Sequence, residues 1–206
     1  MASPDRRAHL RIQPYRFTYE EVLTMVEAGI LRENEKLELV DGHLIKKEYV
    51  GDAHIACSSR LHHTLHERIF DGGLDAICVS LRNPLKLDPH HVLRPDVVLT
   101  NQDSAIPEPG DTRLVIEIAD TTLDYDRDTK LPLYAEAGIP EVWIVNLQAR
   151  QVEVYREPKS QDYTLRLLRD ASTTVDIEGL PDIEPLAVDD LLPSEDGGEA
   201  TDAKSD

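Results

Sequence analysis

Leu114-Val115-Ile116-Glu117-Ile118-Ala119 is the stretch that decides the fold, an apolar run with one carboxylate inside it. Short apolar runs of this kind are typical of strands that are buried on both faces of a sheet. Burying an ionised carboxylate without a partner costs several kcal/mol, so Glu117 should pair with a cation, face an edge or bind a metal. The alternative is a strand whose side chains alternate between the core and solvent, with Val115, Glu117 and Ala119 on the solvent face of the sheet. The pattern alone leaves both interpretations open.

A second carboxylate lies upstream, in Arg94-Pro95-Asp96, which opens the apolar strand Val97-Val98-Leu99. A Pro-Asp pair at the start of a strand is often only turn chemistry. Two acids on neighbouring strands, however, make a candidate two-carboxylate metal site. Hard oxygen ligands of this kind suit Mg²⁺ or Mn²⁺, which keep several of their waters.

Hydrolysis of a phosphodiester needs a nucleophilic water, charge relief at the phosphate and help for the leaving oxygen, and a divalent cation can supply all three. A nearby lysine can orient the water or neutralise phosphate oxygens. Lys130 is the candidate because it follows the Glu117 strand at the start of the next predicted helix, although a solvated lysine is the alternative. Pro132 is tolerated only in a first helical turn, so we predict that this helix begins near Thr129. Lys130 then lies on the lip of the helix, and its loss should leave the fold intact.

The rest of the chain predicts strands around a central pair of helices, which is a mixed α/β layer fold. One helix should follow the N-cap Thr18 and stop at Gly29, and Asp41-Gly42 predicts a hairpin turn. The other predicted elements are helices over 53–70 and 129–137 and strands over 74–80, 84–88, 96–100, 113–119, 141–145, 152–156 and 163–168.

The chain is strongly acidic, with a formal net charge of −18. Residues 195–206 hold five acids and one base, so they account for −4 and leave −14 on the rest. We expect a flexible arm over 1–14, one domain over 15–192 and a disordered acidic tail over 193–206. A duplex-DNA binder ordinarily carries a basic surface, so this charge argues against tight binding of DNA without metal. It does not exclude an enzyme whose bound cations reverse the local field.

Several other classes of function lack support in the sequence. No apolar run approaches the roughly 20 residues of a membrane span, and the N-terminus lacks the apolar core of a secretory signal. Cys57 and Cys78 make no disulfide framework, so a reducing cytoplasm is the default, and a thiol nucleophile lacks an orienting base. No glycine-rich phosphate loop is present, so nucleotide triphosphates are not expected as substrates. His62 and His66 lie four residues apart and can bind zinc, but no further ligand pattern joins them.

The order of Pro-Asp, then Glu on the next strand, then Lys resembles the PD-(D/E)XK nuclease superfamily. More closely, the chain resembles the Uma-type bacterial restriction endonuclease family. The matching stretches are FTYEEVL (17–23), KLELVDGHLI (36–45), His54 at the start of a helix, RNPLKL (82–87), RPDVVLT (94–100), LVIEIADTTLDYDRDTKLPLYAEAGIPEVWIVNL (114–147) and QVEVYRE (151–157).

This resemblance implies an α/β, restriction-endonuclease-like fold with a mixed β-sheet flanked by α-helices. It also implies a Mg²⁺-dependent endonuclease, or one that uses Mn²⁺, which hydrolyses phosphodiester bonds in DNA. The motif acids map onto Asp96 and Glu117, which would hold the metal. The third motif position is Ala119 rather than lysine, and Lys130 matches the place of a later family lysine. We expect Asp96 and Glu117 to converge on one pocket.

Two further residues enter through the resemblance. Glu38 matches a family acid at the rim of the same site and would add a metal ligand or hold a water, although a surface acid is the alternative. His54 matches a family histidine and is a possible accessory residue. The rival hypothesis is a nuclease-fold binding or regulatory protein with little or no activity. A homodimer is the default for an enzyme that cuts both strands of DNA.

Overall fold

The computed structural model describes residues 13–32, 35–46, 51–74, 76–101 and 106–194. Most of the predicted arm (1–12) and of the predicted acidic tail (195–206) lies outside the described residues. In the described part of the chain, no helix combines the length and the apolar character that a membrane span needs.

The main sheet has six strands in the order β10-β9-β8-β7-β6-β3. Neighbouring strands pair antiparallel except for β7 and β8, which are parallel, so the sheet is mixed. The predicted α/β fold with a mixed sheet is therefore confirmed. The strands are β3 (Cys78–Leu81), β6 (Val97–Thr100), β7 (Thr112–Ala119), β8 (Glu141–Asn146), β9 (Gln151–Lys159) and β10 (Asp162–Asp170).

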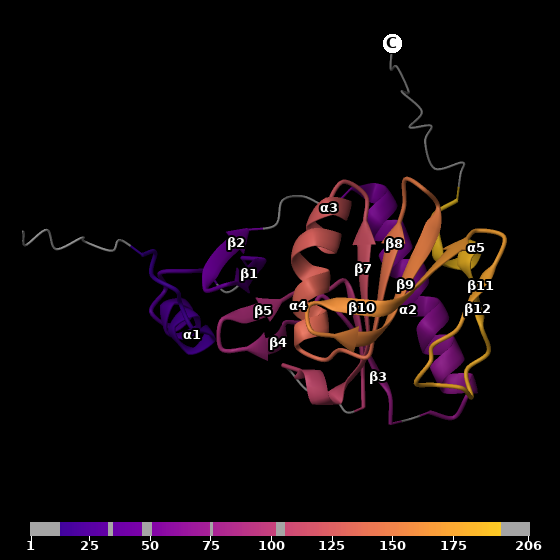
Figure 1. Ribbon diagram of the computed structural model, residues 1–206, viewed down its shortest axis with the longest axis horizontal. Helices are drawn as coiled ribbons and strands as arrows, with labels where there is room; N and C mark the ends of the chain where they lie inside the picture. Colours follow the sequence, from indigo (N-terminus) through magenta and orange to yellow (C-terminus); the bar gives the residue numbers. More distant parts are fainter. Residues whose placement is uncertain (1–12, 33–34, 47–50, 75, 102–105, 195–206) are drawn as a thin grey trace, which may run out of the picture.

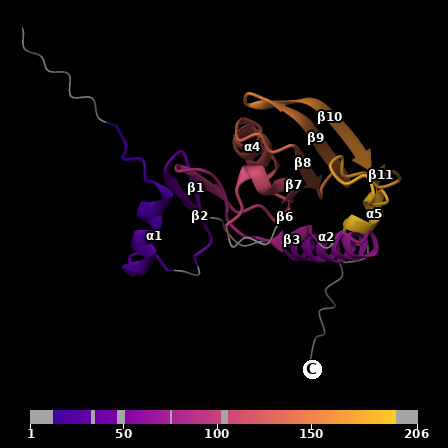
Figure 2. The ribbon, with the colours of Figure 1, turned by 90° about the horizontal axis from the view of Figure 1, so that it is seen from below.

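Helices cover both faces of this sheet, and β7 lies near its middle. The long helix α2 (Asp52–Asp71) and the shorter α4 (Leu131–Glu136) lie on opposite sides of the strands (Figure 2). Ile116 and Ile118 of β7 pack in the core that includes α2, whereas Val115 packs in the core that includes α4. Every residue from Leu114 to Ala119 is buried, which excludes the interpretation of Glu117 as part of a solvent face.

A smaller lobe lies beside the main sheet, at the left of Figure 1. Its four strands, in the order β2-β1-β5-β4, pair antiparallel throughout and pack with α1. The elements are α1 (Tyr19–Glu27), β1 (Leu37–Val40), β2 (His43–Lys46), β4 (Leu85–Asp88) and β5 (His91–Leu93). The predicted Asp41-Gly42 turn joins β1 to β2 with φ of 50° and 73°, and Thr18 caps α1 as predicted. The lobe matters for function because β1 carries Glu38.

The helical segment after β7 begins earlier than predicted. It runs through α3 (Leu123–Tyr125), a π-helical turn η2 (Asp126–Lys130) and α4 without a break, so the predicted start near Thr129 is wrong. Proline inside a regular helix removes one hydrogen bond and clashes with the carbonyl four residues back. The wider π turn directly before α4 accommodates Pro132 at the second position of α4 and lets the helix continue. Lys130 therefore lies inside the helical segment and not on its lip.

Four short elements remain to be placed. They are η1 (Pro109–Asp111), β11 (Thr174–Val175), β12 (Leu186–Ala187) and α5 (Val188–Leu191). The α5 segment packs on α2, where the Cys57 thiol donates to the Leu191 carbonyl. Residues of β11, β12 and α5 complete the core on the α2 side of β7, whereas η1 contributes no buried residue and contacts β4.

Candidate active site

Lys130 is the centre of a buried cluster of charged groups at the junction of the two lobes. Its Nζ lies 2.7 Å from Glu117 Oε1, 3.3 Å from Glu38 Oε1 and 3.6 Å from Asp126 Oδ1. The lysine and Glu38 are fully buried, and Glu117 is 1% exposed. Strands β7 and β1 and the π-helical turn thus bring three carboxylates to one ammonium group. The predicted residues Glu38, Glu117 and Lys130 are in direct contact, and Asp126 is an addition that the sequence had not indicated.

The pKa of Lys130 is set by two opposing effects. Burial lowers the pKa of an ammonium group, but the carboxylates of Glu117, Glu38 and Asp126 outweigh burial and raise it well above its ordinary value. The lysine is therefore a permanent cation at neutral pH and not a general base. Because its pKa in the folded state exceeds that of the unfolded chain, its stabilisation is fully present at neutral pH. That stabilisation is lost only as pH rises through the folded pKa.

Two tyrosines that the sequence analysis missed hold the same carboxylates. The Tyr134 hydroxyl donates to Glu117 Oε1 at 2.5 Å, and the Tyr125 hydroxyl donates to Glu38 Oε2 at 3.3 Å. Burial, reinforced by the charge of Glu117, raises the pKa of Tyr134 well above its ordinary value, so it remains a donor. Tyr134 follows Lys130 by four residues and so shares its helix face. That spacing was a readable signal in the sequence.

Asp96 precedes β6 and reaches the strand that carries Glu117. Its Oδ2 accepts a hydrogen bond of 2.9 Å from the backbone N–H of Ile118. Since Val97 pairs with Ile116 in the antiparallel register, Asp96 lies across from Glu117 at the next position along the two strands. The side chain of Asp96 is buried. The two predicted metal-binding acids therefore lie at the same end of the β6–β7 pair.

A histidine and an arginine surround Asp96. His54, in the first turn of α2, places Nε2 3.1 Å from Asp96 Oδ2. Arg82 follows β3 and places Nε 3.9 Å from Asp96 Oδ1. The structure thus brings the predicted accessory residue His54 to Asp96. Arg82 was missed, because the contact between positions 82 and 96 depends on how β3 and β6 pair.

A second arginine anchors the small lobe to the site. The backbone N–H of Arg94 donates to Glu38 Oε1 at 2.9 Å, and its Nε donates to the Leu37 carbonyl at 3.2 Å. Arg94 directly precedes the Pro95-Asp96 pair. The Arg94-Pro95-Asp96 segment therefore positions Asp96 and also holds Glu38. It connects β1 of the small lobe to the start of β6 in the main sheet.

The chemistry of these donors fits a divalent cation that keeps part of its water shell. Within the described ranges, no group of three or more His, Cys, Asp or Glu side chains is arranged as a metal cage. Mg²⁺ in proteins is commonly held by one or two carboxylates, with water and substrate phosphate oxygens completing its octahedron. Asp96 and Glu117 offer such a pair of hard ligands, with Glu38 nearby on the same lysine. Carboxylate oxygens are hard ligands, so the donors present suit a hard divalent cation better than they suit zinc.

Cys57 and the pair of His62 and His66 were the other candidate sites in the sequence. Burial raises the pKa of the Cys57 thiol to about 12, so this cysteine is not a thiolate nucleophile. The rings of His62 and His66 lie on α2 with centroids 6.1 Å apart, and no metal cluster includes them among the described residues. Neither feature competes with the cluster at Lys130.

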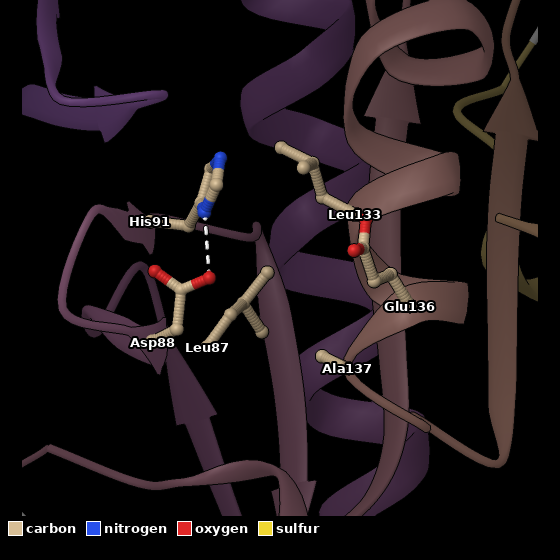
Figure 3. Close-up of a pocket in the computed structure, with 6 residues that line it drawn as sticks. All are labelled: Leu87, Asp88, His91, Leu133, Glu136 and Ala137. Atoms are coloured by element: carbon tan, nitrogen blue, oxygen red, sulfur yellow. Dashed lines mark hydrogen bonds and ion pairs between the residues drawn. The ribbon is translucent and has the colours of Figure 1, made fainter. Parts of the chain in front are cut away.

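A separate cavity of about 140 Å³ lies between the small lobe and α4 (Figure 3). Three apolar and three polar side chains line it: Leu87, Leu133, Ala137, Asp88, His91 and Glu136. Inside it, His91 Nδ1 lies 2.8 Å from Asp88 Oδ2. None of the predicted site residues lines this cavity, so the cavity and the lysine cluster are distinct places in the molecule.

Tyr134→Phe tests whether the tyrosine contributes to the charged cluster. A hydrogen bond to a charged group contributes about 1.5–3 kcal/mol, so we expect the free energy of unfolding to fall by that amount in urea. The matched control is Tyr163→Phe, because the Tyr163 hydroxyl is also buried but donates to a neutral carbonyl, that of Ile139, at 2.8 Å. There we expect about 1 kcal/mol. Equal losses in the two variants would contradict a special contact with Glu117.

Comparison with known proteins agrees with the fold and with the resemblance. The model of the family described as "Uma2: Putative restriction endonuclease" matches residues 19–189. A solved structure described as a putative nuclease belonging to DUF820, from Anabaena variabilis, is 17% identical with a TM-score of 0.67. The match covers 85% of this chain and 97% of that one, and it shows a shared fold. No curated protein matches this chain.

Proposed function

Because this chain belongs to the Uma2 family of putative restriction endonucleases, we propose that it is a metal-dependent endonuclease that hydrolyses phosphodiester bonds in DNA. The observation that carries the proposal is the buried contact of 2.7 Å between Lys130 Nζ and Glu117 Oε1, with Asp96 across the strand pair. A fully buried lysine among several acids is expensive to maintain, because each buried charge loses its hydration. Such perturbed clusters concentrate at functional sites.

In this proposal Asp96 and Glu117 hold Mg²⁺ or Mn²⁺, and Glu38 adds a ligand or holds a water. The cation supplies charge neutralisation at the phosphate and activation of the attacking water. Tyr134 and Lys130 both bind Glu117 Oε1 and so fix the orientation of that carboxylate. His54 does the same for Asp96 at 3.1 Å. Preorganised ligands avoid the cost of reorienting dipoles during the reaction.

Lys130 contributes as a fixed positive charge. Its raised pKa keeps the ammonium protonated, so it stabilises negative charge on phosphate oxygens and does not accept a proton from water. The proton of the attacking water therefore passes to a carboxylate of the cluster or to solvent. A cation at this position also offsets the mutual repulsion of Glu117 and Glu38.

One observation favours the rival, a nuclease-fold binding or regulatory protein. Asp96, Glu117 and Lys130 are all buried residues, with Asp96 the most exposed at 6%. A duplex phosphate reaches these groups only after the small lobe or the side chains shift. The net charge of −14 outside the C-terminal residues 195–206 adds repulsion against DNA. An intact cluster that never opens would bind metal and DNA weakly.

Metal binding should be visible in the melting temperature. A ligand at ten times its dissociation constant stabilises a protein by about 1.4 kcal/mol, which corresponds to about 3–6 °C for a chain of this size. We expect that rise with Mg²⁺ or Mn²⁺ in differential scanning fluorimetry. Asp96→Asn, which keeps an oxygen to accept from Ile118, should fold and lose the response. A melting temperature that is indifferent to both metals at millimolar concentration supports the rival.

Cleavage itself is tested with supercoiled plasmid and with single-stranded DNA, each incubated with Mg²⁺, Mn²⁺ or EDTA. We expect nicked or linear products with either metal and none with EDTA or with Asp96→Asn. Sedimentation of the same sample tests the proposed homodimer, which would place two sites on the two strands. Intact DNA in every condition, with a folded parent protein, would falsify the endonuclease proposal.

A further inference from the structure

Arg82 differs from Lys130 in its access to solvent. Lys130 is fully buried and contacts three carboxylates, whereas the side chain of Arg82 is 34% exposed. Arg82 lies next to Asp96 and His54, at the end of the β6–β7 pair where the proposed metal acids lie. A phosphate that approaches these acids from solvent therefore meets Arg82 before it meets Lys130.

The backbone of Arg82 adopts a conformation that favours glycine. Its φ is 54°, in the left-handed region, where a side chain crowds the following carbonyl. Two contacts hold it there: the Arg82 N–H donates to the Asp96 carbonyl at 3.2 Å, and the Arg82 carbonyl accepts from Arg94 Nη1 at 3.5 Å. Arg82 lies in the short connection between β3 and β4, and positive φ also occurs at Asp41, Arg150, Glu157 and Ser160, but of these five described residues only Arg82 contacts Asp96. Strain of this kind at a non-glycine residue often marks a functional position.

The guanidinium group keeps most of its hydrogen-bonding capacity. Among the described residues, its side-chain contacts are Nε at 3.9 Å from Asp96 Oδ1 and Nη2 at 3.5 Å from His54 Nδ1. Charge-assisted hydrogen bonds are usually about 2.7–2.9 Å long, so both contacts are loose. A guanidinium offers five N–H donors in a planar fork that matches two oxygens of a phosphate. The group is therefore placed to accept an anion without first breaking a strong contact.

We propose that Arg82 binds a backbone phosphate of the nucleic acid at the entrance to the site and guides it toward Asp96 and Glu117. This inference rests on the proposed nuclease function and names the residue that first contacts the substrate. A cation at this position offsets part of the repulsion that the net negative charge of the chain and the carboxylates of the site exert on a phosphate. Arginine binds there as a fork, so lysine at the same position would keep the charge but lose one of two hydrogen bonds.

The test measures binding of a fluorescein-labelled 25-base-pair duplex by anisotropy, with Ca²⁺ in place of Mg²⁺, over a series of KCl concentrations. Loss of one phosphate contact lowers the slope of log Kd against log salt by about 0.9. For Arg82→Gln we expect that smaller slope and an affinity reduced about tenfold. In cleavage assays with Mg²⁺ the same variant should raise KM more than it lowers kcat, because the contact exists before the reaction.

Arg82→Gly is the second variant and guards against misfolding. Glycine fits a φ of 54°, so this variant should fold at least as stably as the parent while it loses DNA affinity as Arg82→Gln does. The matched control is Arg68→Gln. Its side chain is 37% exposed and pairs with one carboxylate, Glu184, at 3.1 Å, but it lies in the last turn of α2, about 20 Å along the helix from His54. We expect no change in slope or affinity there.

The outcomes separate the inference from the proposed function. A parent that cleaves DNA while both Arg82 variants keep its slope, affinity and KM overturns the inference and leaves the function standing. A parent that binds the duplex through Arg82 but cleaves nothing with Mg²⁺ or Mn²⁺ overturns the function and supports the phosphate contact. A parent that shows no measurable binding in Ca²⁺ and no cleavage overturns both.

Discussion

Lys130→Ala should lower the free energy of unfolding by about 3–5 kcal/mol and cut DNA cleavage by about two to four orders of magnitude. The first effect follows from the three carboxylates at 2.7, 3.3 and 3.6 Å from Nζ, which would be left buried together without a cation. The second follows from the loss of the fixed charge that we propose lies beside the phosphate. Urea unfolding at pH 7 measures the first effect, and plasmid cleavage at a temperature where the variant is folded measures the second.

This expectation revises the one drawn from the sequence, in which Lys130 lies on the helix lip and its loss leaves the fold intact. The control is Arg127→Ala, three residues earlier in the same π-helical turn. Arg127 donates to Glu153, but Glu153 also accepts from Arg166 and Tyr155, so its charge stays compensated. We expect a smaller loss of stability and retained cleavage. Parent-like cleavage in Lys130→Ala together with a loss in Arg127→Ala would show that the wrong cation has been assigned.

Much of the fold was predictable because its signals are local. The apolar run of β7, the Asp41-Gly42 turn and the Thr18 cap each depend on residues within a few positions of one another. Short strands such as β5 and β11, of three and two residues, were not predicted, because pairing with a distant partner forms them. The π turn was missed because the sequence shows Pro132 but not how the preceding turn widens to accept it.

Residues of the candidate site could be predicted where the local sequence around a single residue marks it as unusual. A carboxylate inside the buried run marked Glu117, their positions in the chain marked Asp96 and Lys130 as candidates, and the family resemblance added Glu38 and His54. Arg82 was not recognisable, since its place beside Asp96 comes from the pairing of β3 with β6 and from the conformation of one residue. Contacts that depend on strand order and on a single backbone angle have no periodic pattern in the sequence.

Glu117→Gln is expected to separate activity from stability. With all groups ionised, Lys130 and its three carboxylates carry a net charge of −2, so neutralising one acid reduces repulsion within the cluster. A glutamine in the same place keeps an oxygen that can accept from Lys130 and Tyr134. We therefore expect the free energy of unfolding to change by less than about 1 kcal/mol, since the variant leaves no buried cation unpaired.

The same variant should lose function. An amide oxygen carries no charge, so the proposed metal ligand is weakened and cleavage should fall by about two to four orders of magnitude, with the Mg²⁺-dependent rise in melting temperature also lost. The matched control is Glu153→Gln, a fully buried glutamate on β9 that pairs with Arg127 and Arg166. That change leaves two arginines around a neutral amide, so it should cost stability and spare cleavage.

The double variant Lys130→Met with Glu117→Gln measures the energetic coupling between the lysine and the carboxylate it contacts. The buried charges of Lys130 and Glu117 compensate each other. Removing both charges should therefore recover part of the stability that Lys130→Met loses alone. We expect a coupling energy of about 1–3 kcal/mol in a double-mutant cycle. Cleavage should stay as low as in the worse single variant, because the proposed metal ligand and the proposed phosphate-stabilising cation serve the same reaction step. If the changes in unfolding free energy of the two single variants simply add in the double variant, the 2.7 Å contact between Lys130 and Glu117 contributes no coupling energy. If cleavage survives in Glu117→Gln, the metal is bound elsewhere, and Asp96 with its own partners His54 and Arg82 becomes the place to look.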